Sequence, residues 1–428
     1  MTTARRDTTA EPLALEGGPK AKPTPYTTGR RFGDEEMEEL REALEQNTLF
    51  YAKGRKVREL CERFAAMYGK PYCTASSSGT AALHVAMGAA GVTVGDEVVT
   101  STLTDAGTFI GILYQNAVPI FTDVDPRTYN MTADTVEARL TERTRAVIVV
   151  HLSGTPADTD PIVELCRPRG IAVIEDCAQA HLARYRDRLV GTIGDIGCFS
   201  LNDFKHISTG EGGLCITGDQ ALAQRMALFC DKCYPRDHWG MRTGRQCQFL
   251  APNYRMSELC GAVGLAQVRR VEAICARRAE IGRMLTGLIA GVPGILPPEI
   301  PAGCESTHYY YMFRVDENVL GVGRNEVIRA LAAEGVPASF YLKRMDQMEL
   351  FQKMTIYPPR ADGFVCPYDL PQYPPGRLPY AAADCPNADL VLRTAVILSM
   401  TEFWSDDDVR QTAAAIGKVA SSYARRRG

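Results

Sequence analysis

Short, mostly apolar runs alternate with helical stretches between residues 97 and 217, and this alternation narrows the possible folds more than any other feature. The runs are four or five residues long and lack polar–apolar alternation, so each predicted strand is buried on both faces. Buried strands separated by helices are typical of a largely parallel sheet flanked by helices, an α/β fold. Ligands of such sheets bind beyond the carboxyl ends of the strands. The predicted strands are Glu97–Thr100, Pro119–Thr122, Ala146–Val150, Ile171–Ile174, Gly197–Ser200 and Leu214–Thr217, and the predicted helices are Thr108–Gln115, Ala133–Leu140 and Asp160–Arg167.

The chain divides into three predicted parts. Residues 1–33 are polar and contain prolines, which is typical of an arm. Residues 34–270 contain the alternating segment and form the predicted large domain. Residues 271–428 form a predicted smaller α+β domain. In this domain we expect strands at Tyr309–Val315 and Ser339–Leu342, helices at Arg324–Glu334 and Asp406–Tyr423, and a long ordered loop at Tyr357–Pro386.

Composition excludes several classes of protein. The 48 basic and 51 acidic residues give a net charge of −3, which does not favour binding to nucleic acid or to a membrane surface. No apolar run approaches the ~20 residues that span a bilayer, and no hydrophobic signal follows the N-terminus. The 14 cysteines are scattered, which is typical of free thiols in the cytoplasm. Cys230 and Cys233 have C-x-x-C spacing without a second pair, so we expect no metal site.

Two charged residues follow predicted buried strands. The strand Ile171–Ile174 runs directly into Glu175-Asp176, and Lys205 lies before the glycine-rich turn Gly210–Gly213. Alone, Asp176 is better explained by a helix cap or a salt bridge, and Lys205 is equally well explained by a solvated loop. Together they favour pyridoxal phosphate chemistry, which needs a Schiff-base lysine and an acid on the pyridine nitrogen. The segment Ser78–Thr80 at a helix start could hold the phosphate, although it could also be an ordinary N-cap.

Motifs along most of the chain, from about Leu13 to the C-terminus, resemble the DegT/StrS family of sugar and cyclitol aminotransferases. This resemblance implies the fold of fold-type I pyridoxal phosphate enzymes, which is like that of aspartate aminotransferase, with a large domain and a smaller C-terminal domain. The motifs are specific in combination. They are Ser77–His84, Pro119–Asp125, Glu175–His181, Phe199-Ser200 with Lys205 and Gly210–Gly213, and Asn253–Met256.

The resemblance implies how the cofactor ring is held. Lys205 would form the Schiff base with pyridoxal 5'-phosphate and move the proton between substrate and cofactor. Asp176 would pair with the protonated pyridine nitrogen, and Gln179 would hydrogen-bond the phenolic oxygen. The activity implied is transfer of an amino group from L-glutamine or L-glutamate to a ketone on a sugar or cyclitol, as in the biosynthesis of aminosugars or aminocyclitols of the antibiotic type.

The resemblance also implies a phosphate site and an assembly. Gly79, Thr80 and Ser200 would hold the phosphate. Asn253 is similar to the family residue that reaches the phosphate from the partner subunit. The resemblance therefore implies a homodimer with shared active sites.

Asp105 departs from the family pattern, because it stands where an aromatic residue usually stacks on the cofactor ring. Either Asp105 borders the ring as a polar neighbour, or stacking comes from elsewhere. The acceptor's identity is also open. Candidate substrate residues, each of which could equally be surface or core, are the polar and aromatic residues His308, Tyr309, Tyr310, Tyr341 and Arg344.

Two alternatives compete with the aminotransferase. Dehydratases of the same fold use pyridoxamine phosphate and carry histidine in place of the lysine. Lys205 argues against this reading although His206 is adjacent, because Lys205 precedes Gly210 by five residues, the family distance. A non-catalytic, cofactor-binding regulator could use the basic tail Arg425–Arg427 on nucleic acid, but three terminal arginines are more typical of a solvated end.

Overall fold

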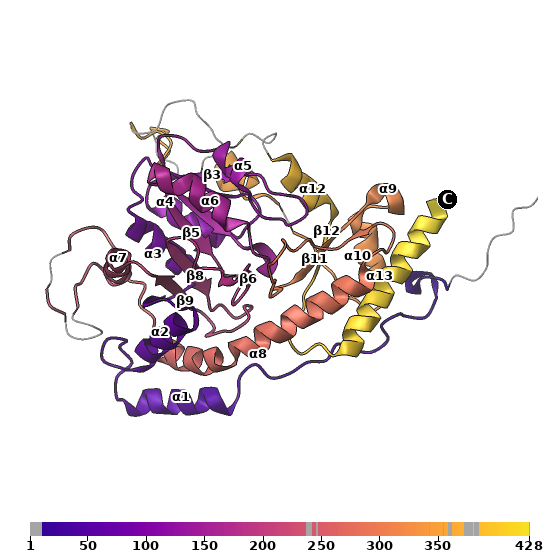
Figure 1. The fold of residues 1–428 in the computed structure, drawn as a ribbon, viewed down its shortest axis with the longest axis horizontal. Coiled ribbons are helices and arrows are strands. Elements are labelled where there is room, and N and C mark those ends of the chain that lie inside the picture. The colour runs from indigo at the N-terminus through magenta and orange to yellow at the C-terminus, as the bar shows by residue number, and fades with distance from the viewer. Residues whose placement is uncertain are drawn as a thin grey trace, which may run out of the picture.

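Figure 1 shows the fold in a computed structural model, which describes residues 11–236, 242–244, 247–341, 343–353, 355–357, 362–371, 380 and 385–427. A seven-stranded sheet and its helices form the larger part, and a three-stranded sheet with α10 and α13 forms the smaller. The helices are α1 (Asp34–Glu45), α2 (Lys56–Met67), α3 (Gly79–Ala90), α4 (Ala106–Tyr114), α5 (Ala133–Glu137), α6 (Thr159–Cys166), α7 (Gln220–Cys230), α8 (Glu258–Ile289), α9 (Glu317–Leu320), α10 (Arg324–Ala333), α11 (Glu349–Gln352), α12 (Pro386–Thr394) and α13 (Asp406–Arg427).

The large sheet is mostly parallel. Strands β3, β2, β4, β5 and β8 run parallel, whereas β9 is antiparallel to both of its neighbours, β8 and β1. Helix α3 packs against β5, β8 and β9. In spatial order the strands are β1 (Tyr72–Ser76), β9 (Gly213–Thr217), β8 (Ile196–Ser200), β5 (Ala172–Asp176), β4 (Thr144–Val150), β2 (Glu97–Ser101) and β3 (Val118–Thr122).

The register of this sheet brings the ends of three strands together. Asp176, at the end of β5, lies opposite Cys198 of β8. Ser200, at the end of β8, and Ser76, at the end of β1, both lie opposite Gly213. The residues that follow β1, β5 and β8 therefore meet at one edge of the sheet, as expected for the ligand edge of an α/β fold.

Helix α8 joins two hydrophobic cores. Its Val268 and Val271 belong to the core around the large sheet, whereas Ile281 and Leu285 belong to the core of the C-terminal part. In Figure 1, α8 runs along the lower side of the molecule between the two parts. The predicted boundary at residue 270 falls inside this helix, and we retain the three-part division as a proposal. The smaller sheet is antiparallel, in the order β10 (Ile295–Leu296), β11 (Tyr311–Val315) and β12 (Ala395–Leu398), and β6 (Arg184–Tyr185) pairs with β7 (Arg188–Leu189).

The described part of the N-terminal arm is anchored to the C-terminal part before it reaches α1. Leu13 is buried in the smaller core, and the Lys22 ammonium forms a buried ion pair of 2.6 Å with Asp408 of α13. The arm then passes along α8 to α1 (Figure 1). The arm thereby connects α13 of the C-terminal part with α1, and α8 lies along its path.

The sheet prediction is largely confirmed. All six predicted strands of the large sheet are present within two residues of their expected ends. Strand β1 was not predicted, because Tyr72–Ser76 is a half-buried edge strand without a run of β-branched residues. Ser339 makes only a single bridge to Ile397, so the strand expected there is wrong for its described residues; Leu342 lies outside them.

Much of the predicted loop at 357–386 lies outside the described residues. Of its described side chains, Tyr368 and Tyr380 are buried and their hydroxyls are 2.7 Å apart. The Tyr380 hydroxyl also donates to the Pro119 carbonyl at 2.9 Å, which ties this segment to β3. The ordered character of the whole loop stays a prediction. Across the portion of the chain that is described, no helix has the length and apolar character that a membrane span requires.

Candidate active site

Asp176 is a buried carboxylate at the ligand edge. Its Oδ2 accepts a hydrogen bond of 2.8 Å from the Thr108 hydroxyl, and its Oδ1 accepts one of 3.1 Å from the Ala178 N–H. Burial raises the pKa of Asp176, while the charge of Lys205 works in the opposite direction. A cationic partner would therefore stabilise the ionised form further.

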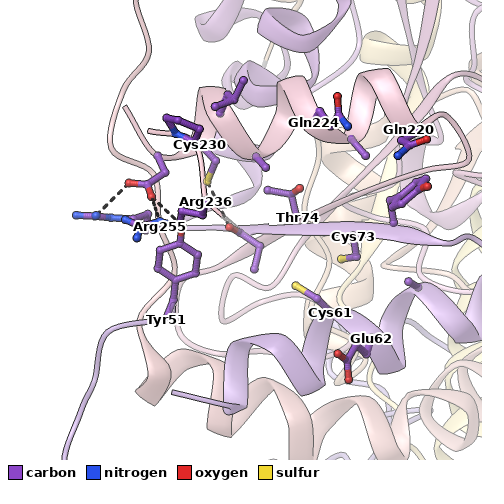
Figure 2. Close-up of a pocket in the computed structure, with 18 of the residues that line it drawn as sticks. Tyr51, Cys61, Glu62, Cys73, Thr74, Gln220, Gln224, Cys230, Arg236 and Arg255 are labelled. Atoms are coloured by element: carbon purple, nitrogen blue, oxygen red, sulfur yellow. Dashed lines mark hydrogen bonds and ion pairs between the residues drawn. The ribbon is translucent and has the colours of Figure 1, made fainter. Parts of the chain in front are cut away.

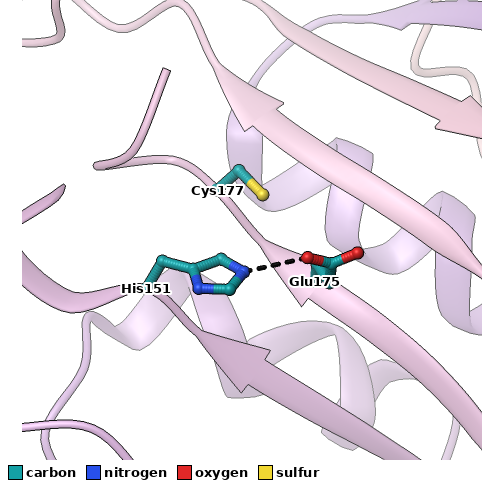
Figure 3. Close-up of side chains that lie close together, drawn as sticks. All are labelled: His151, Glu175 and Cys177. Carbon is teal, nitrogen blue, oxygen red and sulfur yellow. Dashed lines mark hydrogen bonds and ion pairs between the residues drawn. The ribbon is translucent and has the colours of Figure 1, made fainter. Parts of the chain in front are cut away.

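The neighbouring carboxylate, Glu175, anchors the strand that presents Asp176. Its two oxygens accept four hydrogen bonds, from the N–H groups of Gly191, Ile193 and Gly194 at 2.7 Å each and from His151 Nε2 at 3.1 Å. Figure 3 shows the contact with His151. These bonds fasten β5 to the loop before β8.

His151, Glu175 and Cys177 lie close enough together to resemble a metal site, but the ring nitrogens of His151 and the carboxylate oxygens of Glu175 already have hydrogen-bond partners. The Ala157 N–H donates to His151 Nδ1 at 3.0 Å, so the proton of this imidazole lies on Nε2 and points at Glu175. Burial raises the pKa of Cys177 well above its ordinary value, which disfavours the thiolate that a metal would need. The group is therefore a structural anchor (Figure 3).

Glu175→Gln is expected to lower the free energy of unfolding by roughly 2–5 kcal/mol at pH 7, because the amide nitrogen would face buried N–H donors. Burial raises the pKa of Glu175, but the hydrogen bonds from His151, Gly191 and Gly194 outweigh it and leave the pKa lowered. The carboxylate's stabilisation is thus present above the unfolded pKa of about 4.3 and is lost as the pH falls through the lower folded value.

Urea unfolding across this pH range measures the effect, with the exposed Glu164→Gln as the matched control. The stability gap between wild type and Glu175→Gln should narrow in acid. A gap no larger than that of the control at pH 7 would contradict the anchoring role.

Lys205 lies in the turn that follows β8. Its backbone N–H donates to the Asn202 carbonyl at 2.9 Å, and its Nζ lies 4.3 Å from the centre of the Tyr309 ring. Burial lowers the pKa of Lys205, while the negative charges of Asp176 and Asp105 oppose the shift. A desolvated lysine with a lowered pKa is suited to nucleophilic and general-base chemistry.

The start of α3 forms a cradle for an anion. Ser78 caps this helix through the Ala81 N–H at 3.0 Å, which leaves the first two helical N–H groups, of Gly79 and Thr80, without intrahelical partners. A Cβ at position 79 would lie 2.6 Å from the Ser200 Cβ, so only glycine lets the helix start approach β8 this closely. Backbone donors beside a hydroxyl are the groups that hold a phosphate.

Asp105 caps the neighbouring helix, α4, and its Oδ1 accepts from the Gly107 N–H at 2.9 Å. A Cβ at Gly107 would lie 2.7 Å from Thr80 Oγ1 and 3.2 Å from Asp105 Oδ1, so the two side chains flank this glycine. Asp105 is exposed, and its charge acts on Lys205, Asp176 and Tyr309. It is thus a polar neighbour of the reacting groups.

Tyrosines of the C-terminal part line another side of the candidate site, next to Lys205. The rings of Tyr309 and Tyr310 are 5.2 Å apart, and those of Tyr310 and Tyr341 are 6.4 Å apart. Burial raises the pKa of Tyr341 to about 12, and the charge of Asp105 adds to the shift. Gln179 lies at the same place, where its Oε1 accepts from the Ser153 N–H at 2.8 Å.

The other two candidate substrate residues are directed elsewhere. The Arg344 guanidinium is fully buried and holds Asp346 and Asp389, at 2.5 and 2.9 Å. His308 is buried against Gly282 of α8, and burial lowers its pKa to about 4. Arg344 and His308 were chosen from the sequence by residue type alone. We do not propose either of them as a substrate contact.

Asn253 belongs to a segment that runs beside the residues preceding α3, where the Ser77 N–H donates to the carbonyl of the adjacent Tyr254 at 2.7 Å. Asn253 is exposed, and its backbone bridges to Asp231. Asp231 and Arg255 line a separate cavity of about 600 Å³ between α2, β1 and α7, shown in Figure 2, where Arg255 and Arg236 pair with Asp231 at 3.0 and 2.6 Å. None of the residues lining this cavity is a predicted site residue.

The cysteines at C-x-x-C spacing are both buried free thiols. Cys230 lines the separate cavity, and its Sγ contacts the Ala75 carbonyl at 3.4 Å (Figure 2). The Cys233 sulfur accepts from the Gln248 N–H at 3.2 Å. Neither belongs to the metal-like cluster found within the described residues.

The donor set at the sheet edge fits pyridoxal phosphate. Two free helix N–H groups and the Ser200 hydroxyl suit a phosphate, and the Asp176 carboxylate has lone pairs left for a pyridine N–H. Lys205 supplies a desolvated amine. Fold and site together define the class of fold-type I transferases.

The comparisons with known proteins identify the family. Residues 30–363 match the DegT/DnrJ/EryC1/StrS aminotransferase family. The chain belongs to this family and is an aminotransferase, which confirms the predicted family, fold class and enzyme type.

Relatives and solved structures cover most of the chain. The L-glutamine:2-deoxy-scyllo-inosose aminotransferase of Streptomyces lividus is 34% identical over 340 residues, which is 76% of this chain and 79% of the relative. The spore coat polysaccharide biosynthesis protein SpsC of Bacillus subtilis is 32% identical over 393 residues, 91% of this chain and 95% of the relative. The structure of an aminotransferase from Psychrobacter cryohalolentis aligns with a TM-score of 0.79 at 27% identity, covering 93% of this chain and all of that one.

Two residues at the site were missed by the sequence analysis. The Thr108 hydroxyl bonds Asp176, and its position three residues after the cap Asp105 could have indicated it. Arg31 contacts the turn around Lys205, but its bonds go to backbone carbonyls, which leave no signal in the sequence.

Proposed function

We propose that this protein uses pyridoxal 5'-phosphate to transfer an amino group from L-glutamine or L-glutamate to a ketone on a sugar or cyclitol. The observation that carries the proposal is the placement of Asp176, Lys205 and the free start of α3 at one edge of the sheet. The relative named for L-glutamine and 2-deoxy-scyllo-inosose supports this donor and a cyclitol acceptor. Biosynthesis of aminosugars or aminocyclitols of the antibiotic type is the corresponding pathway.

The cofactor, when bound, supplies an electron sink for the reacting carbon. Gly79, Thr80 and Ser200 would hold its phosphate at the start of α3. Asp176 would hold negative charge at the ring nitrogen, and Lys205 would supply the amine that binds the cofactor and carries the proton.

The surrounding residues orient the ring and the substrate. Gln179 lies beside β5 and offers its amide to the phenolic oxygen. Tyr309 covers Lys205 from the C-terminal part and excludes water, Tyr310 packs behind it, and Asp105 and Tyr341 line the acceptor side. The imidazole of His206 is fully buried and donates to the Thr307 carbonyl at 3.1 Å, which supports Lys205 rather than His206 as the reacting residue.

Assembly and location complete the proposal. We infer a homodimer in which Asn253 completes the phosphate site of the partner subunit, and the exposure of Asn253 on this chain is consistent with such a contact. All 14 cysteines, each within the described residues, are free thiols, which supports a location in the reducing cytoplasm. We propose no nucleic-acid or membrane partner, in line with the near-neutral charge.

A panel of keto-sugars and keto-cyclitols tests the function. The purified protein, loaded with pyridoxal phosphate, is incubated with each ketone and with L-glutamine or L-glutamate, and the aminated product is measured by mass spectrometry. We expect product with at least one cyclitol or sugar ketone. Absence of amination across both classes would contradict the substrate proposal, and an active monomer in sedimentation would contradict the shared site.

A further inference from the structure

The N-terminal arm places the guanidinium of Arg31 on the turn that carries Lys205. Its Nη1 donates to the Asp203 carbonyl. Its Nη2 donates to the carbonyl of Lys205 itself at 2.5 Å and to that of His206 at 3.5 Å. One side chain from the arm therefore binds three carbonyl groups around the reacting lysine.

Helix α8 fixes Arg31 from the other side. Gln267 Nε2 and Arg270 Nη2 both donate to the Arg31 carbonyl, at 2.9 and 3.1 Å. Gln267 is buried, and its Oε1 accepts from the Ser208 N–H at 3.3 Å. The arm, the lysine turn and α8 thus form one hydrogen-bonded unit.

Side chains hold the turn after Lys205, through the His206 imidazole on the Thr307 carbonyl and the Ser208 N–H on Gln267, but few backbone bonds cross the turn at Lys205 itself. The Lys205 N–H bonds the Asn202 carbonyl, and the next backbone bond that crosses the turn joins Thr209 to Leu201. Charge-assisted bonds from a guanidinium to several carbonyls are stronger than neutral ones and fix direction as well as distance. The charge of Arg31 also acts on Tyr309, whose ring lies under the lysine amine.

We propose that Arg31 is a positioning residue that sets the place of the Lys205 amine by holding the carbonyls of Asp203 and Lys205. The proposal rests on the proposed function, in which Lys205 is the reacting amine. It assigns a functional role to the N-terminal arm, whose described residues also pack against the C-terminal part and α8.

Three variants test the proposal. Arg31→Ala removes the bridge. Arg31→Lys keeps the charge, but a single ammonium does not reproduce the two-pronged contact. Arg30→Ala is the matched control, because the adjacent Arg30 is exposed and makes no hydrogen bond or ion pair with any described residue.

The first measurement needs no cofactor or substrate. Hydrogen–deuterium exchange of the cofactor-free protein should be about tenfold faster across residues 201–210 in Arg31→Ala than in the control, as expected for local opening of a turn that has lost its bonds. Exchange elsewhere in the large sheet should be unchanged. Equal exchange in the turn would overturn the proposal.

The second measurement separates positioning from folding. In the loaded enzyme, kcat of Arg31→Ala should fall about 10- to 100-fold, while KM for the amino donor changes less than about threefold. The pH midpoint of the visible absorbance of the lysine-bound cofactor should rise, because a nearby positive charge has been removed. Arg31→Lys should keep the midpoint but lose part of kcat, and it carries the test if Arg31→Ala does not fold.

The outcomes are distinguishable from failure of the proposed function. If the wild type shows no absorbance of a lysine-bound cofactor, the proposed function is wrong and exchange alone decides the role of Arg31. If the wild type is active and both Arg31 variants match Arg30→Ala in kcat and midpoint, the positioning role is overturned. Full activity in Arg31→Lys, with activity lost in Arg31→Ala, would contradict the claim that positioning requires the contact of the guanidinium with two carbonyls.

Discussion

Replacing Lys205 by alanine is expected to abolish amino transfer, with kcat lowered by roughly 10⁴-fold or more, because the variant loses both the binding amine and the proton carrier. The same variant should fold at least as stably as the wild type. Burial lowers the pKa of Lys205 in the folded chain. A folded pKa below the unfolded value means that the charged lysine opposes folding at neutral pH, so its removal relieves a cost.

The measurements are single-turnover amino transfer and thermal unfolding of the cofactor-free protein. Lys205→Arg is the matched variant, since it keeps a positive charge but does not bind the cofactor covalently, and it should be equally inactive. Lys53→Ala, at an exposed lysine, controls for the loss of an ammonium group. Activity above a few per cent of wild type in Lys205→Ala would show that another residue does the chemistry.

The large sheet could be predicted from the sequence because strands that are buried on both faces consist almost entirely of apolar residues. A strand such as Ala146–Val150 has no solvent face, so its residues are uniformly apolar. Strand β1 escapes this rule, since three of its five residues are half-buried and it lies at the sheet's edge. The reversal of β9 also leaves no local signal, because strand direction depends on the connection rather than on the strand's own residues.

The part of the candidate site that could be predicted consists of charged residues at or just after the ends of buried strands. Asp176 and Lys205 follow buried strands, so topology alone brings their elements to one edge. His308 and Arg344 were selected by residue type alone, and both are buried with other partners, because residue type does not indicate where a side chain points. The contact of Arg31 joins segments more than 170 residues apart through backbone carbonyls, and only the folded chain reveals it.

Asp176→Asn is expected to lower kcat by about 10²- to 10³-fold, because the neutral amide no longer holds the ring nitrogen in its protonated form. The geometry should survive the change. The asparagine oxygen can still accept from the Ala178 N–H, and its amide can donate to the Thr108 hydroxyl, which can reverse its role. The loss should therefore appear in the chemical step rather than in cofactor binding.

Stability should move in the opposite direction from activity. Burial raises the pKa of Asp176 above its ordinary value, so the ionised carboxylate opposes folding of the cofactor-free protein above the unfolded pKa of about 3.9. Asp176→Asn removes that cost, and thermal unfolding without cofactor should show an unchanged or higher Tm at pH 7. Single-turnover rates measure the chemical step, and titration with pyridoxal phosphate followed by absorbance measures cofactor binding. A near-normal rate in this variant would place the acid on the ring nitrogen elsewhere, and a lower Tm would mean that the carboxylate serves the fold rather than the cofactor.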